Sequence, residues 1–168
     1  MIDPASRYGF MRDVEADLFD WILDDLKARF GEIRFCEVGV FGAGTVRGVY
    51  RRAAEIGCPA QCVGVDFEQY RPNPTPSPDY EFHAGDSADA WRGIKGEFNF
   101  LMVDGCHCVN HAMMDFLNYS PMVKVGGRPI LEQVIESYAQ QGLKDITLCL
   151  GYRAGDIQAY FGDGKKFG

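Results

Sequence analysis

The residues best suited to chemistry lie between Glu37 and Thr45, where an apolar run gives way to glycines. Gly39, Gly42 and Gly44 recur within six positions. Glycine permits the backbone angles of a tight turn and lets a ligand approach the main chain closely. If a helix follows, its free N-terminal amides and partial positive charge suit a carboxylate or a phosphate. The pattern predicts a ligand-binding strand–turn–helix, and a purely structural glycine turn is the alternative.

Three aspartates occupy equivalent places later in the chain, each near the end of an apolar run. Asp66 is placed to accept hydrogen bonds from ribose hydroxyls, so it strengthens the interpretation of the glycine turn as a cofactor site. Asp86, which precedes Ser87, is placed to accept a hydrogen bond from an adenine amino group or, alternatively, to cap the next helix. Asp104 is placed to bind a divalent metal or to orient a substrate hydroxyl, the alternative being a solvated turn residue.

Alternating helices and strands must position these residues. The predicted strands are 33–40, 61–66, 80–84, 99–104 and 145–150, and the predicted helices are 13–30, 46–54, 109–118, 129–141 and 154–161. Gly31 is placed to end the first helix and Thr45 to cap the second, while four prolines within 71–79 predict an exposed loop. This order implies an α/β, Rossmann-like parallel sheet with helices on both faces. Ligands bind at the carboxyl ends of such strands, where the glycines and aspartates lie.

Composition narrows the classes of partner. The chain has 168 residues, enough for one domain, and a net charge of −7 with no cluster of Lys and Arg. Nucleic-acid binding is therefore disfavoured, whereas a small-molecule substrate remains compatible. No run of apolar residues approaches membrane-spanning length, which predicts no membrane partner. The six cysteines form no CxxC pair and suit reduced, mostly buried thiols in the cytoplasm.

Residues 30–125 resemble the class I S-adenosylmethionine (SAM)-dependent methyltransferases. The nearest branch includes cephalosporin-hydroxylase-like and macrolide-sugar O-methyltransferase enzymes. The matching pieces are Glu37-Val38-Gly39-Val40-Phe41 with Gly44, Gly64-Val65-Asp66, Gly85-Asp86-Ser87 and Val103-Asp104-Gly105-Cys106-His107. The branch usually reads Asp-Gly-Asp-His in the last piece, so Cys106 departs from it.

The resemblance implies a role for each matching residue. The methionine part of SAM would lie against Glu37, Gly39, Val40, Phe41, Gly42 and Gly44. Asp66 would bind the ribose, and Asp86 with Ser87 would lie beside the adenine. Asp104 and His107 would face the methyl acceptor as catalytic residues. Asp104 would also be the ligand of a divalent metal such as Mg²⁺, a role that Cys106 weakens.

Two histidines and two cysteines near Asp104 raise a second possibility. His107 and His111 are four positions apart and would share a face of a helix, with Cys106 and Cys108 beside them. These residue types suit zinc. Their spacing matches no familiar structural zinc pattern, and the methyltransferase resemblance already accounts for His107.

The last third of the chain resembles a different family. Pro121–Leu131, Gly142–Ile146, Gly151-Tyr152 and Tyr160–Gly164 are similar to the interior of sugar-1-phosphate nucleotidyltransferases of the glucose-1-phosphate cytidylyltransferase type. That family's Gly-Gly-x-Gly-Thr-Arg nucleotide loop is missing, and Ser120 stands where it has a lysine. We therefore divide the chain into a methyltransferase-like part, 1–120, and a helix–strand–helix part, 121–168, that completes the same domain.

Three functions follow from this truncated or mosaic pattern. The first is SAM-dependent O-methylation of a sugar or small metabolite, with full, reduced or no activity. The second is a non-catalytic module that binds SAM or a nucleotide. The third is a fragment of a sugar-1-phosphate nucleotidyltransferase. An open edge of the sheet would also favour a homo-oligomer, because exposed strand edges tend to pair.

Overall fold

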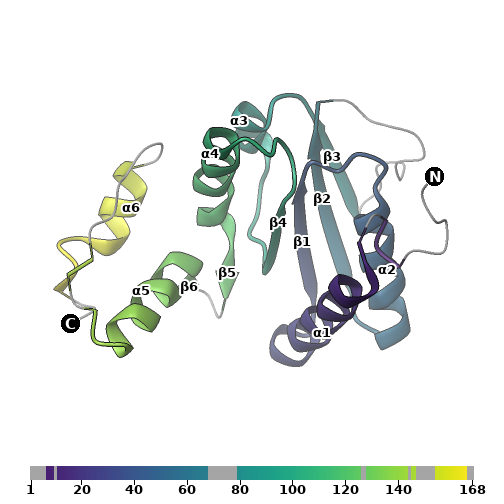
Figure 1. Ribbon diagram of the computed structural model, residues 1–168, viewed down its shortest axis with the longest axis horizontal. Helices are drawn as coiled ribbons and strands as arrows, with labels where there is room; N and C mark the ends of the chain where they lie inside the picture. Colours follow the sequence, from purple (N-terminus) through teal and green to yellow (C-terminus); the bar gives the residue numbers. More distant parts are fainter. Residues whose placement is uncertain are drawn as a thin grey trace.

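Four parallel strands form the main sheet of the computed structural model, which describes residues 7–9, 11–67, 79–125, 128–143, 145–146 and 154–165. The strands are β1 (Ile33–Val38), β2 (Ala60–Asp66), β3 (Tyr80–Ala84) and β4 (Phe100–Val103), in the order β3-β2-β1-β4 (Figure 1). Each strand is short and rich in apolar residues, as expected of strands covered on both faces. The predicted α/β, Rossmann-like fold is confirmed.

The register brings the carboxyl ends of the strands to one edge of the sheet. Val38 at the end of β1 pairs with Val65 of β2 on one side and with Val103 of β4 on the other. Asp66 pairs with Ala84 at the end of β3. The turns that follow the four strands are therefore neighbours in space, although they are far apart in the sequence.

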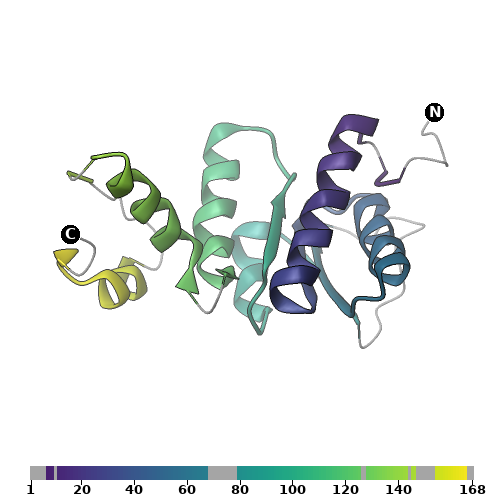
Figure 2. The ribbon, with the colours of Figure 1, turned by 90° about the horizontal axis from the view of Figure 1, so that it is seen from below.

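Helices cover both faces of the sheet. On one face lie α1 (Asp13–Phe30) and α2 (Gly44–Ile56), and on the other lie α3 (Ser87–Ala90) and α4 (Val109–Tyr119) (Figure 2). Alternate residues of β1 point to opposite sides, so that Phe35 belongs to the buried cluster under α1 and α2, and Cys36 to the cluster on the other face. Short 3₁₀ turns follow α3 (Trp91–Gly93) and α4 (Ser120–Met122).

The two predicted helix ends have different outcomes. Gly31 ends α1 in a left-handed conformation (φ +70°), and its N–H donates to the Lys27 carbonyl, as predicted. The prediction that Thr45 caps α2 is wrong. The helix begins at Gly44, two residues earlier than predicted, with Ala43 at the N-cap and no capping side chain. Thr45 is instead buried within the first turn, where its hydroxyl lies against Glu37.

The chain after α4 leaves the sheet. Val123 forms a parallel bridge with Phe98, and β5 (Lys124–Val125) then pairs with β6 (Arg128–Pro129) in a small antiparallel ribbon. Helices α5 (Ile130–Gln140) and α6 (Ala154–Phe161) confirm two predicted helices, and both lie beside the sheet rather than over a face (Figures 1 and 2). Most of the predicted strand 145–150 and of the predicted loop 71–79 lies outside the described residues.

The helices and the cysteine thiols can also be compared with the sequence predictions. Within the described ranges, no helix combines the length and the apolarity that a membrane crossing requires. Cys36, Cys58 and Cys62 are unpaired and buried, as expected of thiols in apolar surroundings. Cys106 and Cys108 are unpaired and exposed, which the sequence did not indicate.

Candidate functional site

Two adjoining clefts open at the carboxyl edge of the sheet. The first has a volume of about 440 Å³ and lies between the turn after β1, the start of α2 and the chain around α1. The second, about 400 Å³, lies between the turns after β1, β2, β3 and β4. Gly39, Phe41 and Asp104 line both clefts, so the turn after β1 forms the boundary between them.

Close packing fixes the turn after β1. Gly39 has a φ of +89°, and a Cβ atom there would lie 2.3 Å from the carbonyl oxygen of Asp104. Only glycine combines that backbone angle with that approach. Phe41 (φ +46°) and Ala43 (φ +53°) are also left-handed, a conformation that costs free energy in residues with a side chain. The shape of the turn is therefore set by its contact with the end of β4.

Asp66 holds the same turn from the other side. One carboxylate oxygen accepts a hydrogen bond from the Phe41 N–H at 2.7 Å, and the other accepts from the Phe67 N–H at 2.7 Å. A carboxylate has about four lone-pair positions, so Asp66 keeps capacity for a ligand. The residue predicted to bind ribose thus lines the second cleft and also ties the glycine turn to β2.

Glu37 is a buried carboxyl group in the first cleft. The residue is 2% exposed, and its Oε2 atom has no hydrogen-bond partner within the described structure. Burial raises the pKa of Glu37 to about 8, the hydrogen bond from Thr45 opposes this, and the charges of Asp104 and Asp66 add to it. Glu37 is therefore largely protonated at neutral pH, and a cationic ligand would both satisfy and ionise it.

The remaining residues predicted for this part of the site also line the first cleft: Val40, Gly42 and Gly44. Its outer wall is the segment around Tyr8 and Gly9, which the sequence analysis missed. A Cβ atom at Gly44 would lie 2.4 Å from the Cα atom of Gly9, so two glycines allow this segment to cross the start of α2. The sequence indicates this wall only weakly, because recognising it requires pairing Gly9 with Gly44, which is 35 positions away.

Asp86 caps helix α3, the structural role that the sequence analysis gave as the alternative to adenine binding. Its side chain accepts a hydrogen bond from the Ala88 N–H at 2.9 Å and caps α3. Asp86 and Ser87 nevertheless line the second cleft together with Asp66. The cap is confirmed, and the role beside adenine stays a prediction.

Of the two predicted catalytic residues, Asp104 lines the clefts and His107 does not. Asp104 lies at the junction of the clefts, with its side chain 53% exposed. His107 Nε2 lies 3.5 Å from Asp104 Oδ1, but its side chain is 84% exposed, and it is not among the described residues that line either cleft. Because α4 begins at Val109, His107 precedes the helix. The expectation that His107 and His111 share a helical face is therefore wrong. The histidine that lines the second cleft is His111.

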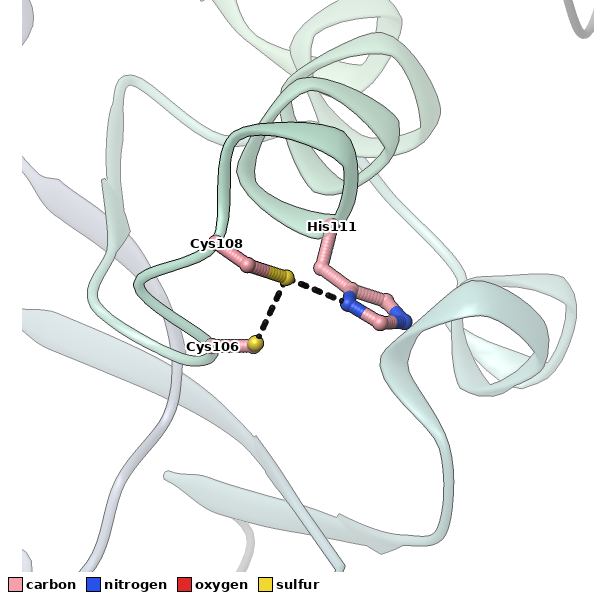
Figure 3. Close-up of side chains that lie close together, drawn as sticks. All are labelled: Cys106, Cys108 and His111. Atoms are coloured by element: carbon pink, nitrogen blue, oxygen red, sulfur yellow. Dashed lines mark hydrogen bonds between the residues drawn. The ribbon is translucent and has the colours of Figure 1, made fainter.

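His111 belongs to an exposed cluster with two thiols (Figure 3). Cys106 Sγ lies 2.9 Å from Cys108 Sγ, which lies 2.7 Å from His111 Nδ1. Hydrogen bonds with Cys106 and then with His111 lower the pKa of the Cys108 thiol to about 7. The hydrogen bond with Cys108 raises the pKa of His111. Cys108 is thus the most acidic thiol of the cluster.

The donor atoms around Asp104 do not fit Mg²⁺, which prefers an octahedron of oxygen ligands. Cys106 supplies sulfur where the related branch has an aspartate, so Asp104 is the one carboxylate in the segment Asp104-Gly105-Cys106-His107. Among the described residues, the one group of three potential ligands whose donor atoms lie within 4.8 Å of one another is Cys106, Cys108 and His111. Thiolate and imidazole suit softer metals than Mg²⁺.

Comparison with known sequences gives a short match. No family model matches the chain. Glucose-1-phosphate cytidylyltransferases of Salmonella typhimurium and Salmonella typhi are each 44% identical to it over 41 residues, which are 24% of this chain and 16% of theirs. The chain therefore spans about one sixth of these curated relatives. This short match supports the predicted resemblance to sugar-1-phosphate nucleotidyltransferases, and it does not show that the chain is a chimera.

Comparison with solved structures identifies the fold. A structure of MycE methyltransferase from the mycinamycin biosynthetic pathway, in complex with Mg, SAH and mycinamycin VI, has a TM-score of 0.54 at 22% identity. The match covers 72% of this chain and 34% of the MycE chain. A second MycE structure, with Mg and SAH, has a TM-score of 0.53 at 19% identity, over 91% of this chain and 44% of its own. The chain spans less than half of these structures, and the likeness shows a shared fold.

Proposed function

We propose that this chain binds SAM across the two clefts and is the cofactor-binding part of a methyltransferase that acts on a hydroxyl group of a sugar or similar small metabolite. The observation that carries the proposal is Glu37, a buried carboxyl group with an unpartnered oxygen, beside the glycine turn of the first cleft. The MycE structures, which share the fold and contain SAH, support the choice of cofactor.

The two clefts suit the two ends of SAM. In the first, Glu37 would meet the ammonium group, and the amides of the turn from Gly39 to Gly44 would meet the carboxylate. In the second, Asp66 would accept from the ribose hydroxyls, and Asp86 with Ser87 would lie beside the adenine. Because Gly39 and Phe41 border both clefts, one ligand can reach from one cleft into the other across this turn.

Methyl transfer forms a carbon–oxygen bond to the acceptor, breaks the carbon–sulfur bond of the sulfonium and releases the hydroxyl proton. When bound, SAM supplies the electrophilic methyl group. Asp104, at the junction of the clefts, is placed to orient the acceptor hydroxyl and accept its proton. His107, 3.5 Å from Asp104, is the second predicted base. Because the donor set does not fit Mg²⁺, no step depends on that ion.

Calorimetric titration with SAM and SAH tests the proposal. Glu37→Gln removes the carboxylate that would pair with the ammonium group, so SAM affinity should fall about tenfold or more. Glu55→Gln, an exposed glutamate of α2 outside both clefts, is the matched control and should bind as the parent does. Near pH 7 the parent should release close to one proton on binding, measured in buffers of different ionisation enthalpy, and Glu37→Gln should release none.

Other results would favour the competing functions. The 41-residue match to cytidylyltransferases is the observation that favours a nucleotidyltransferase fragment. Stabilisation by cytidine triphosphate but not by SAM would support that function and overturn ours. Tight SAM binding without methyl release to any hydroxylated acceptor would indicate a non-catalytic binding module.

A further inference from the structure

We propose that Cys106, Cys108 and His111 form a site for one Zn²⁺ ion, an inference that does not rest on the proposed SAM binding. The three side chains converge from the loop after β4 and the first turn of α4 (Figure 3). Their two sulfur atoms and one ring nitrogen all lie within 4.8 Å of one another. No other described group of three potential ligands is gathered in this way.

The donor types select the metal. Zn²⁺ is bound in proteins by thiolates and imidazoles, and two cysteines with one histidine are an established ligand set. Cys108 is the N-cap residue of α4 and His111 lies in its first turn, which places the Cys108 sulfur 2.7 Å from His111 Nδ1. Cys106 reaches the same point because the loop before α4 folds back, which places its sulfur 2.9 Å from that of Cys108.

The metal-free geometry requires only a small adjustment. A tetrahedral Zn²⁺ with ordinary bond lengths holds pairs of sulfur and nitrogen ligands about 3.5–3.8 Å apart. The adjacent donor atoms here are separated by 2.9 Å and 2.7 Å, so each pair must open by roughly 1 Å. All three residues are exposed, so no packed core resists that movement.

Three protein ligands leave the fourth position of the ion open. Closed structural zinc sites have four protein ligands, whereas sites with three retain an exchangeable water or substrate oxygen. Cys106 and His111 line the second cleft, beside Asp66 and Asp86. The open position therefore adjoins the same cleft as the proposed ribose site, and the fourth ligand is expected to exchange with small anions.

The test uses the full chain, reduced and stripped of metal, titrated with Zn²⁺ against a chromophoric chelator and with Co²⁺ by absorption spectroscopy. We expect one ion per chain and the intense bands of a tetrahedral Co²⁺–thiolate centre, shifted by added azide. Cys106→Ser, Cys108→Ser and His111→Asn should each weaken Zn²⁺ binding about a hundredfold or more, beyond the 10–100-fold typical of residues that only orient ligands.

His107→Asn is the matched control, because His107 is an exposed histidine of the same loop outside the cluster. It should leave the affinity and the Co²⁺ spectrum unchanged. The proposal is overturned if His111→Asn binds as tightly as the parent, if His107→Asn abolishes the spectrum, or if binding exceeds one ion per chain without saturation. Unchanged melting of the metal-free variants would show that each affects the site and not the fold.

Discussion

The sheet with its four covering helices and the segment after β5 are held together in different ways. Around the sheet, buried apolar side chains form a cluster on each face, and Phe35 and Cys36 belong to opposite clusters. In the segment after β5, Ile135 and Phe161 are buried. A buried carboxylate, Glu132, pairs there with Arg128 at 3.0 Å and accepts from the Tyr160 hydroxyl at 2.6 Å.

The two regions are therefore expected to differ in stability. Burial of apolar surface on two faces makes the sheet a cooperative unit, and the buried Ile135 of α5 and Phe161 of α6 belong to neither of its two clusters. The proposed SAM site lies wholly within the sheet unit. The segment that resembles a nucleotidyltransferase is thus expected to open first, without loss of the clefts.

The largest effect is expected from Gly39→Ala. A methyl group at this position meets the backbone of Asp104 at 2.3 Å and requires a left-handed φ, so we expect a loss of about 2–5 kcal/mol in the free energy of unfolding. Denaturant unfolding of the sheet signal measures this loss. Gly31→Ala is the control, because its φ is also positive but no atom lies within 4 Å. Equal losses in the two variants would contradict the argument from close packing.

Glu37→Gln is expected to change the pH dependence of stability within the sheet unit. The pKa of Glu37 is raised from 4.5 to about 8 in the folded protein, so the folded state holds a proton that the unfolded state has released. The parent should therefore lose stability as the pH rises from about 4.5 to 8, by a few kcal/mol in all. Glu37→Gln should remove that slope from unfolding curves measured between pH 5 and 8.

The exposed Glu55→Gln serves as its control and should keep the slope of the parent. A Glu37→Gln variant that loses stability with pH as steeply as the parent would show that another group carries the dependence. The comparison depends on slopes, because a glutamine amide buried beside Thr45 shifts the absolute stability at every pH.

Asp86 allows the two roles of one carboxylate to be separated. Asp86→Ala removes the cap of α3 and should cost about 1 kcal/mol, whereas Asp86→Ser retains a good cap. If Asp86 also contacts the adenine, SAM affinity should fall in both variants, although stability falls only in the first. Calorimetry and thermal unfolding on the same samples measure the two effects. Full SAM affinity in Asp86→Ser would leave Asp86 with the structural role alone.

The fold was largely predictable from the sequence because its signals are local. Short apolar runs ending in Gly or Asp mark β1, β2 and β4, and their order with the helices fixes a parallel sheet. Thr45 shows the limit of such signals. Its residue type suits an N-cap, but the contact of Gly39 with the end of β4 and the left-handed Ala43 set the start of α2 instead.

The parts of the site that the backbone forms were predictable from the sequence. The parts that depend on contacts between side chains or between distant segments were less predictable. All the predicted residues from Glu37 to Gly44 line the first cleft, because the turn itself is the wall. The wall around Tyr8 depends on a contact between distant segments. His107 was preferred over His111 because of its place in the methyltransferase-like motif, whereas α4, which begins at Val109, leaves His107 in the preceding loop and places His111 beside Cys108.

The smallest global effect is expected from Tyr160→Phe. The variant removes the hydroxyl that donates to Glu132 and should weaken the contact between α6 and α5 by about 1 kcal/mol. Hydrogen exchange should become faster in α6 and in the adjoining part of α5, while the amides of β1 and β2 keep their rates. Tyr138→Phe, at an exposed position of α5, is the control and should leave both regions unchanged. Faster exchange in β1 would instead mean that the two regions unfold together, and the distinction between them would fail.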